Sequence, residues 1–329
     1  MKIAGYIGGL LGLGLLVAMV LRTDLPSMLQ ALASAGWPLL WLVPYRTLYF
    51  GLYALGWLCL LRPYEAGARA GAAYLFWVTT VREAIDRLLP VASVGGGVVG
   101  VRLVRWRGVP SSAVGATVII EIVLTLVVSY AFTALGLILL LTMNPTGAQY
   151  RRLLLGFVVS LPVPVLTVLL LRYGSVFARL ERFLSPLVGE SALSQGAKSL
   201  DEELRACLGR WRSLAAAGLF QFAALMAGSF EVWFALRLLG HPVDAQAAII
   251  LESMTQTVRH LAFVVPAGLG VQEATLVLFG HALGISAELA LAVSMAKRVR
   301  EVLCGVPALL SWQWMEGRRL RGALRDPAA

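Results

Sequence analysis

Long apolar runs limit the fold of this chain more than any other feature of its sequence. Stretches such as 113–141 and 213–236 are almost wholly apolar. A helix needs about 20 apolar residues to cross the hydrocarbon core of a bilayer. Only 14% of the residues are charged, whereas soluble domains carry about 25%. No run alternates like an outer-membrane barrel strand, so the sequence predicts an all-α integral membrane protein.

Six apolar stretches are long enough to be predicted as full spans. They are 3–21, 37–61, 113–141, 153–171, 213–236 and 286–314. The first follows Lys2 in the manner of a signal peptide, but no A-x-A cleavage site follows it, so we expect it to be retained as a helix. We expect the prolines of the fourth to kink it.

Two further apolar stretches are not simple spans. Residues 70–100 carry four charges and then a run of glycines, and residues 245–283 carry Glu252 and Arg259 before a proline and two glycines. Irregular backbone persists at membrane depth only where protein buries it or it lines a wet cavity. We therefore predict two re-entrant helical hairpins. Their turn or hinge residues are Pro90, Gly95, Gly96, Gly97, Pro266, Gly268 and Gly270.

The two predicted hairpins share one spacing. Pro90 and Pro266 are 176 positions apart (266 − 90 = 176), and Gly108 and Gly284 are separated by the same number (284 − 108 = 176). Identity between the copies is low, and two loops with chance spacing are the alternative. The duplication predicts a single transmembrane domain, 1–329, that contains repeat one at 70–141 and repeat two at 245–314.

Basic residues in the loops predict the orientation. The net charge of +10 is concentrated in short links and the tail, at 62–69, 102–107, 172–212 and 318–325. Lys and Arg mark cytoplasmic loops, so we expect both termini in the cytoplasm of a bacterial cell, with the protein in the inner membrane. The hairpins would then enter from opposite sides, as an inverted repeat. Residues 175–211 have helical apolar spacing and are predicted as a cytoplasmic amphipathic segment, either a connecting helix or a lipid sensor.

Charged and polar side chains within the apolar stretches are the candidate substrate-binding residues. Each charge costs about 2.5–3.5 kcal/mol at the centre of a membrane helix, so it must be paired or face water. The i, i+4 spacing of Arg82 with Asp86 and of Glu83 with Arg87 also suits local ion pairs, and Glu273 also suits a helix cap. The candidates are Arg46, Arg82, Glu83, Asp86, Arg87, Arg102, Glu121, Glu252, Gln256, Arg259, Glu273, Lys297, Arg298 and Glu301.

Motifs for catalysis, metals and cofactors are absent from the sequence. The three cysteines and three histidines are scattered, without metal-ligand or disulfide spacing. The glycine triplet at 95–97 is not a dinucleotide fingerprint, because no strand precedes it and its spacing differs. We therefore predict no catalytic residue, no metal and no cofactor. The basic charge is explained by orientation and lipid headgroups, so no nucleic-acid partner is expected.

The two glycine motifs carry a resemblance to a known family. Over roughly residues 5–315 the chain resembles the transmembrane flippase-like family, which includes the membrane half of lysylphosphatidylglycerol synthases. The motifs are Pro90…Gly95-Gly96-Gly97…Arg102…Gly108 and Pro266-x-Gly-x-Gly-x-x-Glu273…Gly284…Arg298. The second motif, with its flanking residues, is most similar to the hopanoid-biosynthesis-associated branch. In the first motif four residues separate Pro90 from the glycines, whereas many members place the proline directly before them.

The resemblance implies a lipid flippase with two opposed hairpins around a headgroup cavity. We therefore predict a transporter, not an enzyme, that moves a hopanoid or another polar lipid between leaflets. A non-catalytic scaffold for lipid-biosynthesis enzymes and a membrane-embedded headgroup transferase are the alternatives. The expected partners are membrane lipids, hopanoid or anionic phospholipid, with a homo-oligomer as a further option. The soluble aminoacyltransferase half is not in this sequence, so lysyl transfer is not implied.

Overall fold

A computed structural model describes residues 25–64, 70–89, 95–143, 148–174, 191–262, 265 and 268–325. Every regular element in these ranges is a helix, and they contain no strand. The predicted all-α fold is therefore confirmed for this part of the chain. The predicted first span at 3–21, Pro90 and Pro266 lie outside the described residues.

The helices of the first half include two short 3-10 turns. In order they are α2 (Leu25–Ala35), η1 (Trp37–Trp41), α3 (Leu42–Leu61), η2 (Arg62–Tyr64), α4 (Ala72–Leu88), α5 (Gly95–Arg105) and α6 (Ser111–Met143). The second half is α-helical in its described parts. Its helices are α7 (Ala148–Ser160), α8 (Pro162–Tyr173), α10 (Ser191–Gly209), α11 (Trp211–Leu238), α12 (Ala245–Leu261), α13 (Val271–Ala282) and α14 (Ala287–Arg325).

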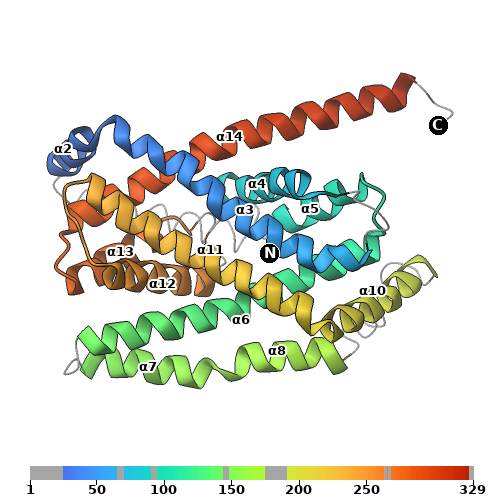
Figure 1. Ribbon diagram of the computed structural model, residues 1–329, viewed down its shortest axis with the longest axis horizontal. Helices are drawn as coiled ribbons and strands as arrows, with labels where there is room; N and C mark the ends of the chain where they lie inside the picture. The colour runs from blue at the N-terminus through green and yellow to red at the C-terminus, as the bar shows by residue number, and fades with distance from the viewer. Residues whose placement is uncertain are drawn as a thin grey trace.

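Three stretches of helix in the described ranges are long and apolar enough to cross a membrane. They are Ser111–Met143, Arg151–Tyr173 and Trp211–Leu238. The second stretch combines α7 and α8, and the helix is interrupted between them at Leu161. Pro162 is the first residue of α8, a position where the backbone N–H that proline lacks would have no partner within the helix. Only 6% of the apolar window of that stretch is buried, so α7 and α8 lie at the periphery (Figure 1). The prediction of six spans stays a prediction, because α3 and α14 are not in this set.

One scheme of helix contacts recurs in the two halves. Helices α3 and α11 pack against each other through the middle of the molecule (Figure 1). Helix α4 packs on α5, as α12 packs on α13, and the α12–α13 pair lies to the left of the α4–α5 pair in Figure 1. The long helices are exchanged between the halves: α14 packs on α4, and α6 packs on α12. The two halves therefore interlock through equivalent contacts.

The apolar core is divided into two main clusters. One contains Trp57 of α3 and the buried face of α4, and the other contains Leu42 of α3 and Leu291 of α14. Along α3, Arg46 lies between the two clusters. Along α14, residues 297–301 lie between Leu291 and Ala308, which belong to different clusters. Arg46 and the charges at 297–301 therefore lie in a layer between two apolar cores.

Two glycines allow α5 to approach α4 closely. The backbone N–H of Gly96 donates to Asp86 Oδ1 at 2.9 Å. A Cβ on Gly96 would lie 2.5 Å from the carbonyl oxygen of Arg82, and one on Gly100 would lie 2.6 Å from Arg82 Cδ. Gly97 faces elsewhere, since its nearest neighbour would be Val118 Cγ1 at 3.4 Å. The spacing of Gly96 and Gly100 is that of a small-residue helix contact.

The apolar face of α10 is covered by protein. Leu204 is fully buried, Cys207 is 2% exposed, and Leu200 lies beside Gly115 of α6. Helix α10 packs chiefly on α6. Its amphipathic pattern is therefore satisfied within the fold in the described part of 175–211, and the predicted cytoplasmic position stays a prediction.

We expect Gly96→Ala to lower the stability of the protein and Gly97→Ala to leave it unchanged or raise it. Alanine favours a helix over glycine by about 1 kcal/mol, but overpacking against the carbonyl of Arg82 costs about 1–3 kcal/mol. Thermal unfolding in detergent, followed by tryptophan fluorescence, measures both variants. Equal melting temperatures for the two would contradict the close α4–α5 contact.

Candidate functional site

A cavity of about 390 Å³ is lined by residues of α3, α4, α6, α11 and α12, together with Val265 and Gly268. Aromatic side chains of α3 and apolar side chains of α6 and α11 form part of its wall. Much of the remaining wall is charged or polar. The predicted binding residues that line it are Arg82, Glu83, Asp86, Arg87, Glu121, Gln256 and Arg259. The structure therefore brings together half of the candidate residues from both predicted repeats around one space.

The wall of the cavity at α6 includes an exposed apolar side chain. Ile122 lines the cavity and is also 56% exposed. Other large apolar side chains on α6, including Val127 and Ile138, are exposed as well. Apolar side chains exposed on a membrane-length helix face lipid. Ile122 therefore belongs both to the cavity wall and to the exposed apolar surface of α6.

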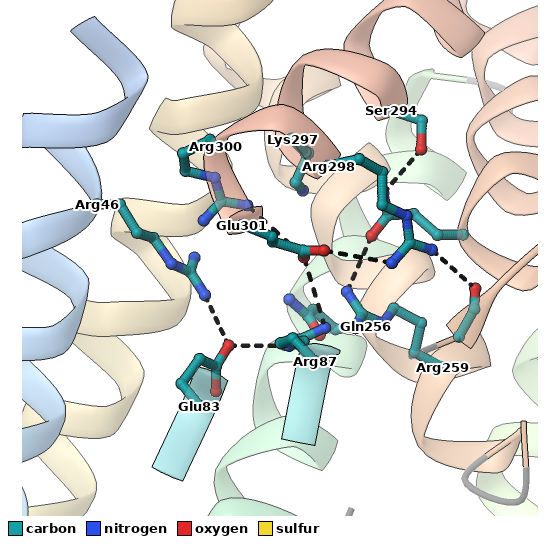
Figure 2. A network of polar contacts seen from close by, with 12 residues as sticks. Arg46, Glu83, Arg87, Gln256, Arg259, Ser294, Lys297, Arg298, Arg300 and Glu301 are labelled. Carbon is teal, nitrogen blue, oxygen red and sulfur yellow. Dashed lines mark hydrogen bonds and ion pairs between the residues drawn. The ribbon is translucent and has the colours of Figure 1, made fainter. Parts of the chain in front are cut away.

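Arg46 links α3 to two other helices. Its guanidinium lies 3.1 Å from Glu83 of α4 and 3.4 Å from Glu231 of α11, and it is 4% exposed. It also lies over the ring of Tyr49, 3.5 Å from the centroid. Figure 2 shows Glu83 between Arg46 and Arg87, which is 2.9 Å from the same carboxylate. The expected i, i+4 pair of Glu83 with Arg87 is thus present.

Helix α14 provides the other side of this arrangement. Its charges at 297–301 are almost consecutive, so they point around the helix towards different neighbours. Lys297 contacts Glu252 of α12 at 2.7 Å, and Arg300 contacts Glu231 of α11 at 3.0 Å. Arg298 contacts Glu273 of α13 at 3.3 Å and Glu301 at 3.2 Å. One turn of α14 therefore joins three helices.

Glu273 is held by side chains and does not cap its helix. It is fully buried, and its Oε1 accepts from Ser294 Oγ at 2.7 Å as well as contacting Arg298. The N-cap position of α13 is Gly270, where no side-chain cap bond forms. Gly268 and Gly270 have φ of 59° and 74°, a left-handed conformation that favours glycine. Arg298 also donates to the carbonyl of Gly268 at 3.3 Å, which ties this turn to α14.

The buried charges balance. Because an isolated buried ion is costly, an equal number of opposite charges is what a stable interior requires. The cations of the network are Arg46, Arg87, Lys297, Arg298 and Arg300. The carboxylates are Glu83, Glu231, Glu252, Glu273 and Glu301. We refer to these ten residues as the ion-pair network.

Two cavity charges are left out of the ion pairing among the described residues. Arg82 does not pair with Asp86, as its spacing had suggested; it reaches Glu121 at 2.7 Å, and Asp86 accepts from Gly96 N–H. Arg259 donates to Gln272 at 2.9 Å and has no carboxylate within 4.0 Å in that part of the chain. One cation and one carboxylate therefore face the cavity without an ionic partner.

The sequence was compared with known protein families. The family model described as the lysylphosphatidylglycerol synthase TM region matches residues 5–307. The chain belongs to this family. No curated protein and no solved structure gives a significant match. The predicted family is confirmed. Together with the apolar helices, it shows that this is a membrane protein, and it suggests a function related to lipids.

In this lysylphosphatidylglycerol synthase transmembrane-region protein, each half has an ion pair between the first helix of its short pair, α4 or α12, and the long helix that follows that pair. Arg82 of α4 pairs with Glu121 of α6, and Glu252 of α12 pairs with Lys297 of α14. The signs of the two pairs are reversed. Glu121 and Lys297 are 176 positions apart (297 − 121 = 176), the spacing of the two glycine motifs.

The site residues predicted from the sequence differ from those in the structure at two positions, Arg102 and Glu231. Arg102 is placed away from the cavity, where it pairs with Glu316 of α14. Glu231 was missed, although it bridges Arg46 and Arg300. Glu231 is the one charge in the predicted span 213–236. A charge inside a span needs a partner or water, so this signal could have identified it. In the described ranges no group of three or more His, Cys, Asp or Glu side chains could hold a metal ion.

We expect Glu231→Gln to destabilise the protein strongly. The change leaves Arg46 and Arg300 buried with a shared carboxylate removed, and loss of one member of a buried pair costs about 3–5 kcal/mol. Glu202→Gln on the exposed face of α10 is the matched control and should unfold like the wild type. Detergent melting curves compare them. A wild-type melting temperature for Glu231→Gln would show that the network does not stabilise the fold.

Proposed function

We propose that this protein moves a polar lipid between leaflets by passing the headgroup through the cavity. The observation that carries the proposal is a charged cavity inside a membrane protein whose wall includes Ile122, an exposed apolar residue of α6 at which we place a lateral opening. A lipid headgroup in bare hydrocarbon lacks partners for its polar atoms, which costs several kcal/mol per group. The cavity supplies such partners, and the lateral opening lets the acyl chains stay in the bilayer.

The unpaired charges support a headgroup path. Arg259 can donate to a phosphate or hydroxyl oxygen, and Asp86 can accept from an ammonium or hydroxyl group. The ion-pair network around them is already neutral, so a headgroup does not have to disrupt it in order to bind. Arg259 and Asp86 lie on α12 and α4, one in each half, so a headgroup could be passed between the halves.

The architecture that we propose consists of six spans and two opposed re-entrant hairpins in an inverted repeat. The exchanged packing of α6 and α14 supports it, as does the separation of the α4–α5 pair from the α12–α13 pair in Figure 1. Opposed hairpins are suited to alternating access, because each can close one side of a shared site. We place the protein in the bacterial inner membrane with cytoplasmic termini on the basis of its basic loops.

The cargo that we favour is a hopanoid or a similar polar lipid. The support for a hopanoid is the likeness of the motif around Arg259, Glu273 and Arg298 to the hopanoid-associated branch. A phospholipid is the other cargo with which Arg259 could form an ion pair. Transport assays should therefore include both an amino- or polyol-bearing hopanoid and a phospholipid.

We expect Arg259→Gln and Asp86→Asn each to slow lipid movement about tenfold or more. A hydrogen bond to a charged group contributes about 1.5–3 kcal/mol, and 1.4 kcal/mol corresponds to tenfold. The measurement is the rate at which acyl-labelled lipid becomes accessible to an impermeant quencher in proteoliposomes. Arg237→Gln, on the exposed end of α11, is the control and should transport normally.

The same assay separates the alternatives. Wild-type rates for both cavity variants would remove Arg259 and Asp86 from the path. Absence of transport by the wild type for every lipid offered would contradict the proposed function. Mass spectrometry of the recovered lipid detects the transferase alternative, since a transferase alters the headgroup and a transporter returns it unchanged.

A further inference from the structure

A second cavity, of about 620 Å³, lies between α5 and the C-terminal half of α14. It is separate from the central cavity, because the two have no lining residue in common. Its wall combines apolar and basic side chains, which are Val98, Val101, Arg102, Arg105, Trp106 and Arg319. We refer to this space as the α5–α14 groove.

The groove has an excess of positive charge. Arg102 is paired with Glu316, but Arg105 and Arg319 have no carboxylate within 4.0 Å in the described part of the chain. Arg319 instead lies over the ring of Trp106, 4.9 Å from its centroid. An arginine stacked on an aromatic ring keeps its edge N–H groups free for an oxyanion. The groove is therefore complementary to an anion.

The apolar surface next to the groove places it at the boundary of the membrane. Val302, Val306, Leu310 and Trp314 are all exposed and recur every four residues, so they form one lipid-facing stripe on α14. The stripe ends at Trp314, and Arg318 stacks on that ring at 4.5 Å. Tryptophan and arginine at the end of an apolar stripe are typical of the headgroup level.

We propose that the α5–α14 groove binds an anionic phospholipid. The phosphate would be held by Arg105 and Arg319, with Arg102 beside them, and an acyl chain would lie along Val98 and Val101. Val98 is 66% exposed and precedes Arg102 by one helical turn, so α5 presents apolar and basic groups in the order that a lipid requires. A free phosphate would leave this apolar wall uncovered. This lipid is distinct from the transported one.

Binding at the groove acts on α5, which packs against the cavity-lining helix α4. The first two turns of α5 contact Asp86 and Arg82 through Gly96 and Gly100, and its last turn carries Arg105 into the groove. The ion pair of Arg102 with Glu316 already ties α5 to α14. A phosphate bridging Arg105 and Arg319 adds a second tie, so the bound lipid stabilises the α4–α5 pair.

Native mass spectrometry of the full chain, titrated with phosphatidylglycerol or phosphatidylcholine, tests the inference. We expect the wild type to bind phosphatidylglycerol more tightly than phosphatidylcholine. The double variant R105Q/R319Q should bind phosphatidylglycerol about tenfold more weakly or worse. The matched control is R151Q/R152Q, two exposed arginines on α7 outside both cavities, and should keep wild-type binding. The charge-conserving variant R105K/R319K should bind more tightly than R105Q/R319Q.

Three results would overturn the inference. Equal binding of the two lipids by the wild type would show that the groove does not select an anion. Equal losses in R105Q/R319Q and R151Q/R152Q would show a diffuse attraction to basic surface. Displacement of phosphatidylglycerol by an equal concentration of inorganic phosphate would show a phosphate site without a lipid. None of these results bears on transport through the central cavity.

Discussion

The pairing of buried charges is the constraint on which this structure depends. A charge in an apolar helix must find a partner or water, and Arg46, Lys297 and Arg300 are each 4% exposed or less. Their carboxylates come from α4, α11, α12 and α14. The ion-pair network therefore determines which helix faces lie against each other in the layer between the two apolar cores. Removing one member leaves its partner as an uncompensated buried ion, so each pair stabilises the contact between the helices that it joins.

The balance of the network also prepares the cavity for a ligand. The ten network charges satisfy one another, and Arg82 is satisfied by Glu121. Arg259 and Asp86 are left facing the cavity without an ionic partner among the described residues. In such a site the paired charges hold the helices in place, and the unpaired charges are available to bind a ligand. The glycines at 96, 100, 268 and 270 bring these helices and turns close enough for the contacts to form.

The fold class and most residues of the charged layer could be predicted from the sequence, because the cost of placing a charge in lipid can be judged residue by residue. The all-α fold, the membrane setting and the local Glu83–Arg87 pair follow from apolar runs and helical spacing. Partner choice does not follow from the sequence. Arg82 could reach Asp86 on its own helix, and it pairs with Glu121 only because α4 and α6 both pack on α3 and α5, which brings the two side chains together. The same applies to Arg102, whose partner Glu316 is 214 positions away. Glu231 is the one charge in an apolar span, so the need of such a charge for a partner predicts its importance, although it was not among the predicted site residues. Arg259 was among them, but nothing in the sequence indicates that it lacks a carboxylate partner.

Accessibility of single cysteines from each side of the membrane tests the central claim, that two hairpins enter from opposite sides to enclose the cavity. Cys59, Cys207 and Cys304 would first be replaced, and single cysteines introduced at exposed Gly71, Arg107, Asp244 and His281. These positions are at the outer ends of the α4–α5 and α12–α13 pairs. The account predicts that an impermeant thiol reagent labels 71 and 107 from one side and 244 and 281 from the other. Labelling of 71 and 107 from different sides, or of all four from one side, would contradict it.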